Sequence, residues 1–222
     1  MSPVICIDGP SGAGKGTISL RLAEHLGWHL LDSGALYRVV GYAAHRLGVD
    51  WADVPGVAQI ARSLEVRFST SAEGVSVFLA GEDVTVPVRS EFGGKGASAV
   101  AVLPEVRDAL LARQRELAEP PGLVADGRDM GTTVFPNAAL KIFLTASAEA
   151  RAQRRYSQLL ARGESVSLPR LLDAIRERDA RDRDRQASPL VAAEDAITID
   201  STNLSIDQVL RQVLDLAVEK GL

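Results

Sequence analysis

Short apolar runs alternate with longer stretches of helical periodicity along most of the chain. Four runs, at 4–7, 123–125, 140–144 and 196–199, are almost entirely apolar, and Leu30-Leu31 forms a shorter fifth one. Continuous rather than alternating apolar character is typical of strands buried on both faces of a parallel sheet. The pattern therefore predicts five such strands.

Between these runs, apolar residues recur every three or four positions. This spacing predicts helices at 15–26, 35–47, 104–118, 148–161, 168–187 and 206–218. Pro104 fits a first helical turn, where its missing N–H needs no partner, and Ser205 fits an N-cap. Strands and helices in alternation predict an α/β fold, with a central parallel sheet flanked by helices.

One segment breaks this rhythm. Residues 64–68 and 75–79 alternate apolar with polar or small positions, and a third short piece at 84–86 follows Gly81. Alternation over such lengths, with a polar connector, is typical of a hairpin. We therefore expect a small antiparallel insert within 50–90.

Composition narrows the function classes. The chain has 222 residues, of which 46% are hydrophobic and 24% charged, as in a globular protein rather than a disordered one. A net charge of −4 argues against sequence-independent binding to nucleic acid. The apolar run before Asp8 is too short for a signal peptide, and no run reaches membrane length. We therefore expect a cytoplasmic protein that does not bind membranes.

A glycine-rich run follows the first predicted strand. Its residues are Gly9, Pro10, Ser11, Gly12, Ala13, Gly14, Lys15, Gly16 and Thr17. Glycines let backbone N–H groups turn toward phosphate oxygens, and the next helix adds partial positive charge at its N-terminus. Lys15 can reach the β- and γ-phosphates, and Thr17 supplies the hydroxyl for Mg²⁺ one position later than the strict pattern requires. The run is a P-loop and predicts binding of a nucleoside triphosphate with Mg²⁺.

Several arginines are placed for a second phosphate. Transfer of a phosphoryl group needs positive charge around that group and in-line positioning more than covalent help from the protein. Arg38 follows the second predicted strand, and Arg128 follows a core strand. Farther along, one helical face carries Arg178, Arg181, Asp182 and Arg185. Alone, this last run also suits a solvated helix face with internal ion pairs.

Four blocks of sequence together resemble the bacterial cytidylate kinases, P-loop nucleoside-monophosphate kinases that phosphorylate CMP and dCMP. The blocks are IDGPSGAGKGT at 7–17, LDSGALYR at 31–38, ADGRDMG at 125–131 and ERDARDRDR at 177–185. They span nearly the whole chain in the expected order, and Lys-Gly-Thr is usual in this class of kinase. The resemblance implies a three-layer P-loop kinase fold whose antiparallel insert lies in the monophosphate-binding region.

The same resemblance implies a division of labour within one kinase domain. The core would comprise 1–32, 91–150 and 168–222, the monophosphate-binding region 33–90, and the lid 151–167. Residues 9–17 would bind ATP, with Mg²⁺ at Thr17, and the catalytic residues would be Lys15, Arg128 and Arg155. The lid would bring Arg151, Arg154, Arg155 or Arg162 over the ATP phosphates. The expected partners are ATP and CMP or dCMP, and the expected state is a monomer.

The residues expected to bind CMP fall into three groups. Ser33, Arg38 and Arg128 would surround the acceptor phosphate, with Tyr37 nearby. The cytosine edge would meet Ser98, Arg107, Asp129 and Arg185. Arg178 and Asp182 would contact the ribose and phosphate. Asp129 also suits a simpler role, in which it pairs with an arginine or lies near Mg²⁺.

Other P-loop proteins are the alternatives. A GTP-dependent switch usually reads guanine with Asn-Lys-x-Asp, but Asn137 and Asn203 are followed by Ala and Leu. A kinase of another small acceptor, such as UMP, AMP, shikimate or a sugar, would share the P-loop without needing the base-reading set. A non-catalytic nucleotide-binding protein would have no need of Lys15 and Thr17 together.

Overall fold

A parallel sheet of five strands forms the centre of one of two compact units. The computed structural model describes residues 2–71, 74–161, 163–184 and 187–222. The first unit comprises 1–31 and 118–222, and the second unit comprises 32–117. In order across the sheet the strands are β2 (His29–Asp32), β6 (Leu123–Gly127), β1 (Val4–Asp8), β7 (Leu140–Thr145) and β8 (Ile197–Asp200). β1 runs parallel to β6 and β7, and β7 runs parallel to β8, so the predicted sheet is confirmed.

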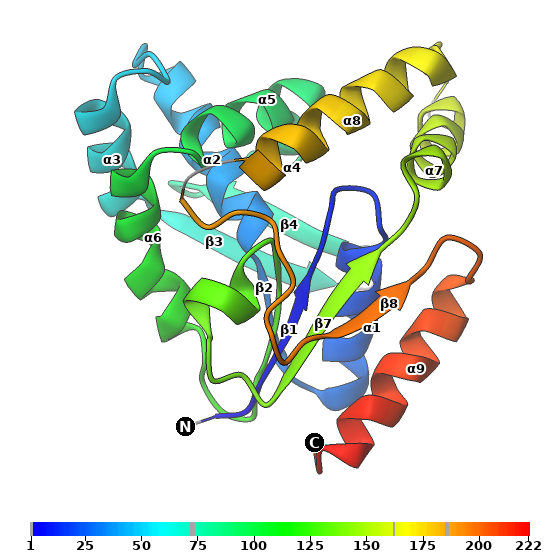
Figure 1. Ribbon diagram of the computed structural model, residues 1–222. Helices are drawn as coiled ribbons and strands as arrows, with labels where there is room; N and C mark the ends of the chain where they lie inside the picture. The colour runs from blue at the N-terminus through cyan, green and yellow to red at the C-terminus, as the bar shows by residue number, and fades with distance from the viewer. Residues whose placement is uncertain (1, 72–73, 162, 185–186) are drawn as a thin grey trace. The chain divides into compact units, whose positions relative to one another are not determined.

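Among its described residues, the first unit contains four helices and one π-helical turn. They are α1 (Lys15–Leu26), α7 (Ala148–Ala161), α8 (Leu168–Asp184), α9 (Ile206–Glu219) and the π-helical turn η1 (Met130–Val134). Figure 1 labels the four helices. Ser205 caps α9 as predicted: its Oγ accepts a hydrogen bond from the Gln208 N–H, and Gln208 Oε1 accepts one from the Ser205 N–H. The end of the helix predicted at 168–187 includes 185–186, which lie outside the described residues.

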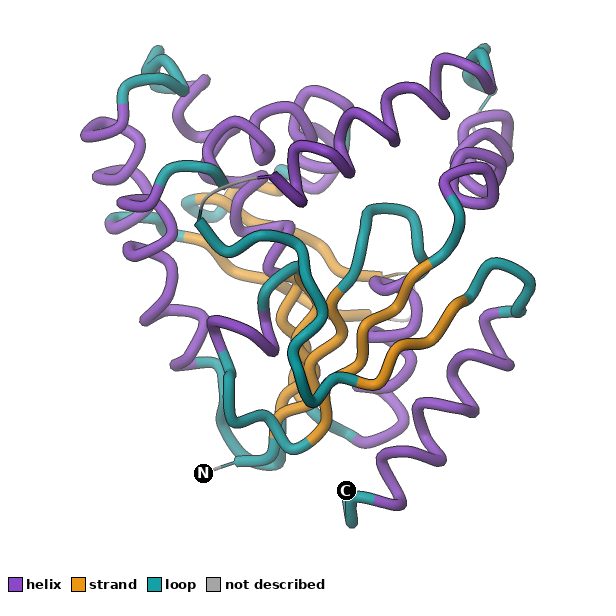
Figure 2. Tube along the Cα trace, viewed as in Figure 1, coloured by secondary structure: helices purple, strands orange, loops and turns teal. Residues whose placement is uncertain are grey.

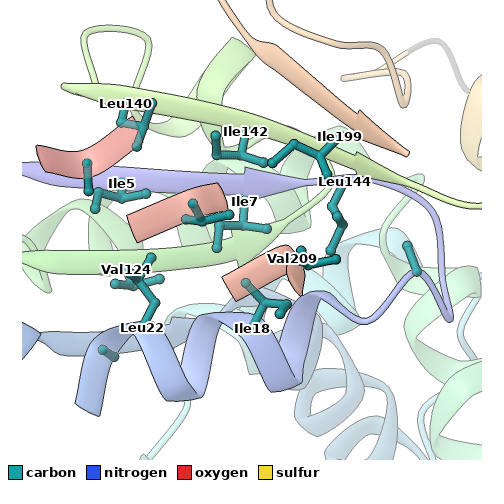
Figure 3. Packing of buried hydrophobic residues seen from close by; sticks show 14 residues of the cluster. Ile5, Ile7, Ile18, Leu22, Val124, Leu140, Ile142, Leu144, Ile199 and Val209 are labelled. Carbon is teal, nitrogen blue, oxygen red and sulfur yellow. The ribbon is translucent and has the colours of Figure 1, made fainter. Parts of the chain in front are cut away.

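The core of this unit lies between the sheet and two of its helices. Figure 3 shows Ile5 and Ile7 of β1 in one apolar cluster with residues of β6, β7, β8, α1 and α9. Ile18 and Leu22 of α1 are almost completely buried in that cluster. Cys6 is also fully buried, and this burial raises the pKa of its thiol above the usual range. The packing fixes β1, and therefore the loop that leaves it.

The second unit contains five helices and the predicted insert among its described residues. The helices are α2 (Ser33–Arg46), α3 (Val54–Arg62), α4 (Thr85–Arg89), α5 (Glu91–Val100) and α6 (Pro104–Glu116). β3 (Val66–Ser71) and β4 (Gly74–Leu79) pair antiparallel, and β5 (Glu82–Asp83) pairs antiparallel with β4. The antiparallel insert is therefore confirmed.

The prediction of a third strand at 84–86 is wrong. The strand ends at Asp83, and Thr85 already begins α4. Asp83 Oδ1 accepts a hydrogen bond from the Thr85 N–H at 2.9 Å, which turns the chain out of the sheet. Pro87 then suits the first turn of a helix, because a proline has no N–H to give to a strand ladder.

Helices α2 and α5 approach each other at two glycines. A Cβ atom on Gly41 would lie 2.8 Å from the carbonyl carbon of Gly96, which is closer than packed atoms allow. The second unit therefore depends on the absence of a side chain at this crossing. Of the helices that the structure describes, none is both long enough and apolar enough to cross a membrane.

Candidate active site

The P-loop has the backbone geometry that the sequence predicts. Figure 2 shows it as a loop that joins the end of β1 to the start of α1. Gly9 has a φ of 144°, and a Cβ atom there would lie 2.0 Å from the Leu144 carbonyl oxygen. Gly14 has a φ of 102° immediately before α1 begins at Lys15. A helix N-terminus that follows such a loop directs its free N–H groups toward an anion.

Lys15 is buried beside a carboxylate. Its Nζ donates to the Pro10 carbonyl at 3.1 Å and lies 3.8 Å from Asp126 Oδ1. Burial, and then the charge of Arg128, lower the pKa of Lys15 to about 8, although Asp126 and Asp8 oppose this shift. The ammonium is thus held next to the loop in surroundings that favour an additional anion.

Asp126 is a further candidate for the site, which the sequence reasoning did not select. It lies on β6, where it is the register partner of Ile7 on β1. A Cβ atom on Gly16 would lie 3.5 Å from Asp126 Oδ2, so the carboxylate borders the first turn of α1. Thr17 is exposed in the same turn. A hydroxyl and a carboxylate are oxygen ligands that suit Mg²⁺. The signal that could have found Asp126 is its place at the end of a strand next to the P-loop strand.

No cluster of three or more His, Cys, Asp or Glu side chains suited to a metal occurs among the described residues. This is compatible with Mg²⁺, which proteins usually hold through one or two carboxylates together with substrate phosphates. The donor set at Thr17 and Asp126 therefore fits a Mg²⁺ that arrives with a nucleotide.

An ion pair joins the segment after β6 to α8. Arg128 Nε lies 3.1 Å from Asp182 Oδ2, and both side chains are mostly buried. Asp129 is only 3% exposed, and Arg178 on α8 is half-buried. The first unit thus brings Arg128 together with Asp182, both of them predicted acceptor residues. Arg185, predicted to contact cytosine, lies outside the described residues.

Two of the predicted lid arginines donate hydrogen bonds to backbone carbonyls of the P-loop. Arg151 is 4% exposed, and it donates to the Ser11 carbonyl at 3.1 Å and to both carboxylate oxygens of Asp179 on α8. Arg154 donates to the Ala13 carbonyl at 3.3 Å and to Ser201. A guanidinium group only donates, so these bonds occupy loop carbonyls and take up none of the loop N–H groups.

Arg155 differs from its two neighbours on α7. It is half-buried, and it makes no hydrogen bond or ion pair with any residue that the structure describes. Arg162 lies outside the described residues. Asp179, like Asp126, was not selected from the sequence, although it precedes Asp182 by the three-residue spacing of one helix face.

The second unit holds the other predicted acceptor residues. The Arg107 guanidinium lies 5.6 Å from the centre of the Tyr37 ring, and its Nη1 donates to the Ala101 carbonyl at 3.2 Å. Arg38 Nη1 donates to the carbonyls of Val88 and Ser90, at 3.0 and 3.2 Å. The Arg38 and Arg107 cations are therefore oriented by backbone carbonyls of their own unit.

Two serines complete this set. Ser33 is buried at the first position of α2, whose N-cap Asp32 accepts from the Ala35 N–H at 2.9 Å. Ser98 lies on α5 and donates to the Gly94 carbonyl of its own helix at 3.1 Å. Because α2 and α5 pack directly through Gly41 and Gly96, both serines belong to the same pair of packed helices.

The sequence model of one protein family, described as cytidylate kinase, matches residues 5–219. The chain belongs to the cytidylate kinase family. A cytidylate kinase of Pseudomonas syringae pv. tomato is 59% identical over 215 residues, which cover 96% of this chain and 94% of that protein. A cytidylate kinase of Stutzerimonas stutzeri is 56% identical over 222 residues, which cover 99% and 97%.

Similarity to solved structures is much weaker. A gluconokinase from Sinorhizobium meliloti 1021 is 15% identical, with 96% of this chain and 90% of that chain covered at a TM-score of 0.49. Nothing about the activity of this cytidylate kinase family member follows from so distant a likeness.

Proposed function

We propose that this member of the cytidylate kinase family transfers the γ-phosphate of ATP to CMP or dCMP, which yields ADP and CDP or dCDP. The observation that carries the proposal is the family match over residues 5–219, in a chain that keeps Lys15 and Thr17 in a correctly folded P-loop. The P-loop supports a phosphoryl donor, and the arginines of the described chain support a second phosphate as acceptor.

The donor side rests on the P-loop and α1. Loop N–H groups bind the ATP phosphates, and Lys15 offsets the charge that develops on the transferring group. Thr17 and Asp126 would hold Mg²⁺, which neutralises charge on the β- and γ-phosphates when it is bound. Arg155 completes this charge from α7, since Arg151 and Arg154 already bond to the loop backbone and its neighbours.

The acceptor side needs no general base. An oxygen of the CMP phosphate, already ionised near neutral pH, attacks the γ-phosphorus in line. A new P–O bond forms to CMP while the bond to the bridging oxygen of ADP breaks. Arg128, Arg38 and Ser33 hold the acceptor phosphate in our proposal, with Tyr37 beside them. Their role is to keep two anions close together in the reacting geometry.

The base and sugar are recognised by the remaining predicted residues. Cytosine carries a 4-amino donor where uracil carries an oxygen acceptor, so a carboxylate such as Asp129 discriminates between them. Ser98, Arg107 and Arg185 would hold the rest of the pyrimidine edge, and Arg178 and Asp182 would contact the ribose and phosphate. The buried state of Asp129 supports this role, because a dry carboxylate is selective about its partner.

The regional roles belong to the same proposal. Residues 33–90 bind the monophosphate, 151–167 act as the lid, and the rest of the chain forms the core. A cytoplasmic location and a monomeric state stay predictions, which cell fractionation and size-exclusion chromatography would check.

An acceptor panel tests the proposed function directly. ADP release from ATP and Mg²⁺ is coupled to NADH oxidation, with CMP, dCMP, UMP, AMP, shikimate or gluconate as acceptor. We expect the highest kcat/KM with CMP or dCMP. A preference for AMP or a sugar would assign another acceptor, and GTP hydrolysis without any acceptor would favour the switch class.

A further inference from the structure

A buried carboxylate at the end of β1 holds the segment that carries Arg128 and Asp129. Asp8 is the last residue of β1 and is 5% exposed. Its Oδ1 accepts the Met130 N–H, and its Oδ2 accepts the Gly131 N–H, each at 2.8 Å. Both carboxylate oxygens are therefore bound by consecutive amides of the first turn of η1.

The aliphatic stem of Lys141 packs against the same turn, close to Asp8. A Cβ atom on Gly131 would lie 3.0 Å from Lys141 Cδ and 3.4 Å from Asp8 Oδ2. Lys141 is itself fixed, because its Nζ donates to the Pro136 carbonyl at 2.6 Å and to Asp195 Oδ1 at 2.8 Å. Lys141 and Asp8 therefore leave little free space on the side of Gly131 where a Cβ atom would lie.

Asp129 is held by this turn through its own backbone. Its carbonyl accepts hydrogen bonds from the N–H groups of Thr133 and Val134, at 2.9 and 3.2 Å. The next two amides along the chain, those of Met130 and Gly131, are the pair bound by Asp8. Backbone hydrogen bonds thus anchor the chain from Asp129 onward, and Asp8 accepts the two that come directly after Asp129.

Burial disfavours the charged form of Asp8. Burial is the largest effect and raises the pKa of Asp8 to about 6, against the lowering effect of the two backbone amides. A buried ion is retained at neutral pH although a neutral side chain would be easier to bury. A carboxylate can accept hydrogen bonds from two neighbouring N–H groups, one at each oxygen. A neutral amide side chain cannot do so, because it has only one acceptor atom.

We infer that Asp8 is a positioning residue for acceptor selectivity: by clamping the Met130 and Gly131 amides, it sets the place from which Asp129 distinguishes CMP from UMP. This inference rests on the proposed function, since it assigns Asp8 a part in the choice of acceptor. Asp8 touches neither substrate in this role, and it acts through the backbone of η1. Misplacement of a binding group by about 1 Å can change a rate by about 10²-fold.

The variant that tests this inference is Asp8→Asn, which keeps the shape of the side chain. Its single carbonyl oxygen can accept one of the two N–H groups, and its NH₂ then faces the other donor. We expect the CMP/UMP ratio of kcat/KM to fall by about tenfold and KM for CMP to rise. The matched control is Asp195→Asn, which removes the charge of the mostly exposed partner of Lys141 and leaves the Lys141 bond to the Pro136 carbonyl in place. This control should leave the ratio unchanged.

A second variant covers the case in which Asp8→Asn does not fold. Gly131→Ala pushes the same turn away from Lys141 and Asp8 with the carboxylate intact, and it should lower the CMP/UMP ratio in the same direction. If both variants lose stability but keep the wild-type ratio, Asp8 only stabilises the fold and the inference is overturned.

Amide hydrogen exchange separates this inference from the proposed function. In the wild-type protein without nucleotide, NMR should show slow exchange at the Met130 and Gly131 amides, and exchange should be faster in Asp8→Asn. Wild-type protein that does not phosphorylate CMP would refute the proposed function, whatever the exchange rates of these amides. Equal protection of both amides in wild type and Asp8→Asn would refute the clamp, even with CMP kinase activity intact.

Discussion

Lys15 carries its charge in a place that disfavours it until a nucleotide arrives. Burial and Arg128 lower its pKa to about 8, well below the ordinary value for lysine. The side chain is bound to the Pro10 carbonyl and lies near Asp126. A phosphate bound in the loop would place further negative charge near this ammonium and so favour its charged form. We therefore expect the surroundings of Lys15 to favour binding of an anion.

The pKa of Lys15 predicts a pH dependence for ATP use. The group is charged below its pKa, so kcat/KM for ATP should fall as the pH rises through about 8. Lys15→Arg should remove this alkaline limb, since an arginine stays protonated. Lys15→Met should lower kcat by about 10³-fold or more, with an unchanged circular dichroism spectrum. Near-normal turnover by folded Lys15→Met protein would exclude the residue from the mechanism.

Asp129 predicts a change in base selectivity. An asparagine at this position can donate to the uracil oxygen, so Asp129→Asn should lower the preference for CMP over UMP. The loss of one selective hydrogen bond in a buried site corresponds to about 1–3 kcal/mol of discrimination. The measurement is kcat/KM for both acceptors. An equal loss for CMP and UMP would show that Asp129 serves the phosphate site or the fold instead.

Helix α7 divides its arginines between two tasks. Arg151 and Arg154 donate to the carbonyls of Ser11 and Ala13, and Arg151 also binds Asp179. Arg155, one position after Arg154, makes no hydrogen bond or ion pair with the part of the chain that the structure describes. One helix therefore both supports the P-loop and carries a cation that is not bound to the described part of the chain.

This division predicts different defects for two alanine variants. Arg155→Ala should lower kcat by about 10²-fold or more with little change in Tm, because it removes charge only from the transition state. Arg151→Ala should lower Tm and raise KM for ATP, because it leaves Asp179 without its partner at a cost of about 3–5 kcal/mol. Thermal unfolding and steady-state kinetics on both proteins make the comparison. Identical profiles would mean that the two arginines act alike.

Element by element, the sequence predicted the parallel sheet, the P-loop, the insert and the cap at Ser205, because each has a local signal. It did not predict α5, whose stretch contains Gly93, Gly94 and Gly96, all poor helix formers. There, close packing on α2 at Gly41 outweighs local propensity. The spacing of residues in the sequence also could not show that Arg151 binds a loop carbonyl, since the direction of a long side chain depends on partners far away in the sequence.

At the scale of the whole molecule, the predicted acceptor residues are distributed over both units. Arg128, Asp129, Arg178 and Asp182 belong to the first unit, and Ser33, Tyr37, Arg38, Ser98 and Arg107 belong to the second. A kinase must also keep water from the γ-phosphate, or it becomes an ATPase. Binding of the substrates should therefore change the dynamics of segments from more than one part of the chain.

Hydrogen exchange checks this expectation. Amide exchange in 33–90 and 151–167 should slow when a non-hydrolysable ATP analogue and CMP are present together, and less with either one alone. Peptides from the β1 core, already buried, serve as the internal reference. Unchanged protection in both segments would indicate a site that works without closure.

The buried thiol of Cys6 has a practical consequence. The sequence contains one cysteine, and it is fully buried with a pKa raised above the usual range. Maleimide dyes react with accessible thiolates, so they should not label the native protein. Cysteines introduced at the exposed positions Val86 and Val218, one in each unit, could then carry a donor and an acceptor fluorophore. Energy transfer between the two fluorophores would then report changes in the distance between the labelled positions during turnover.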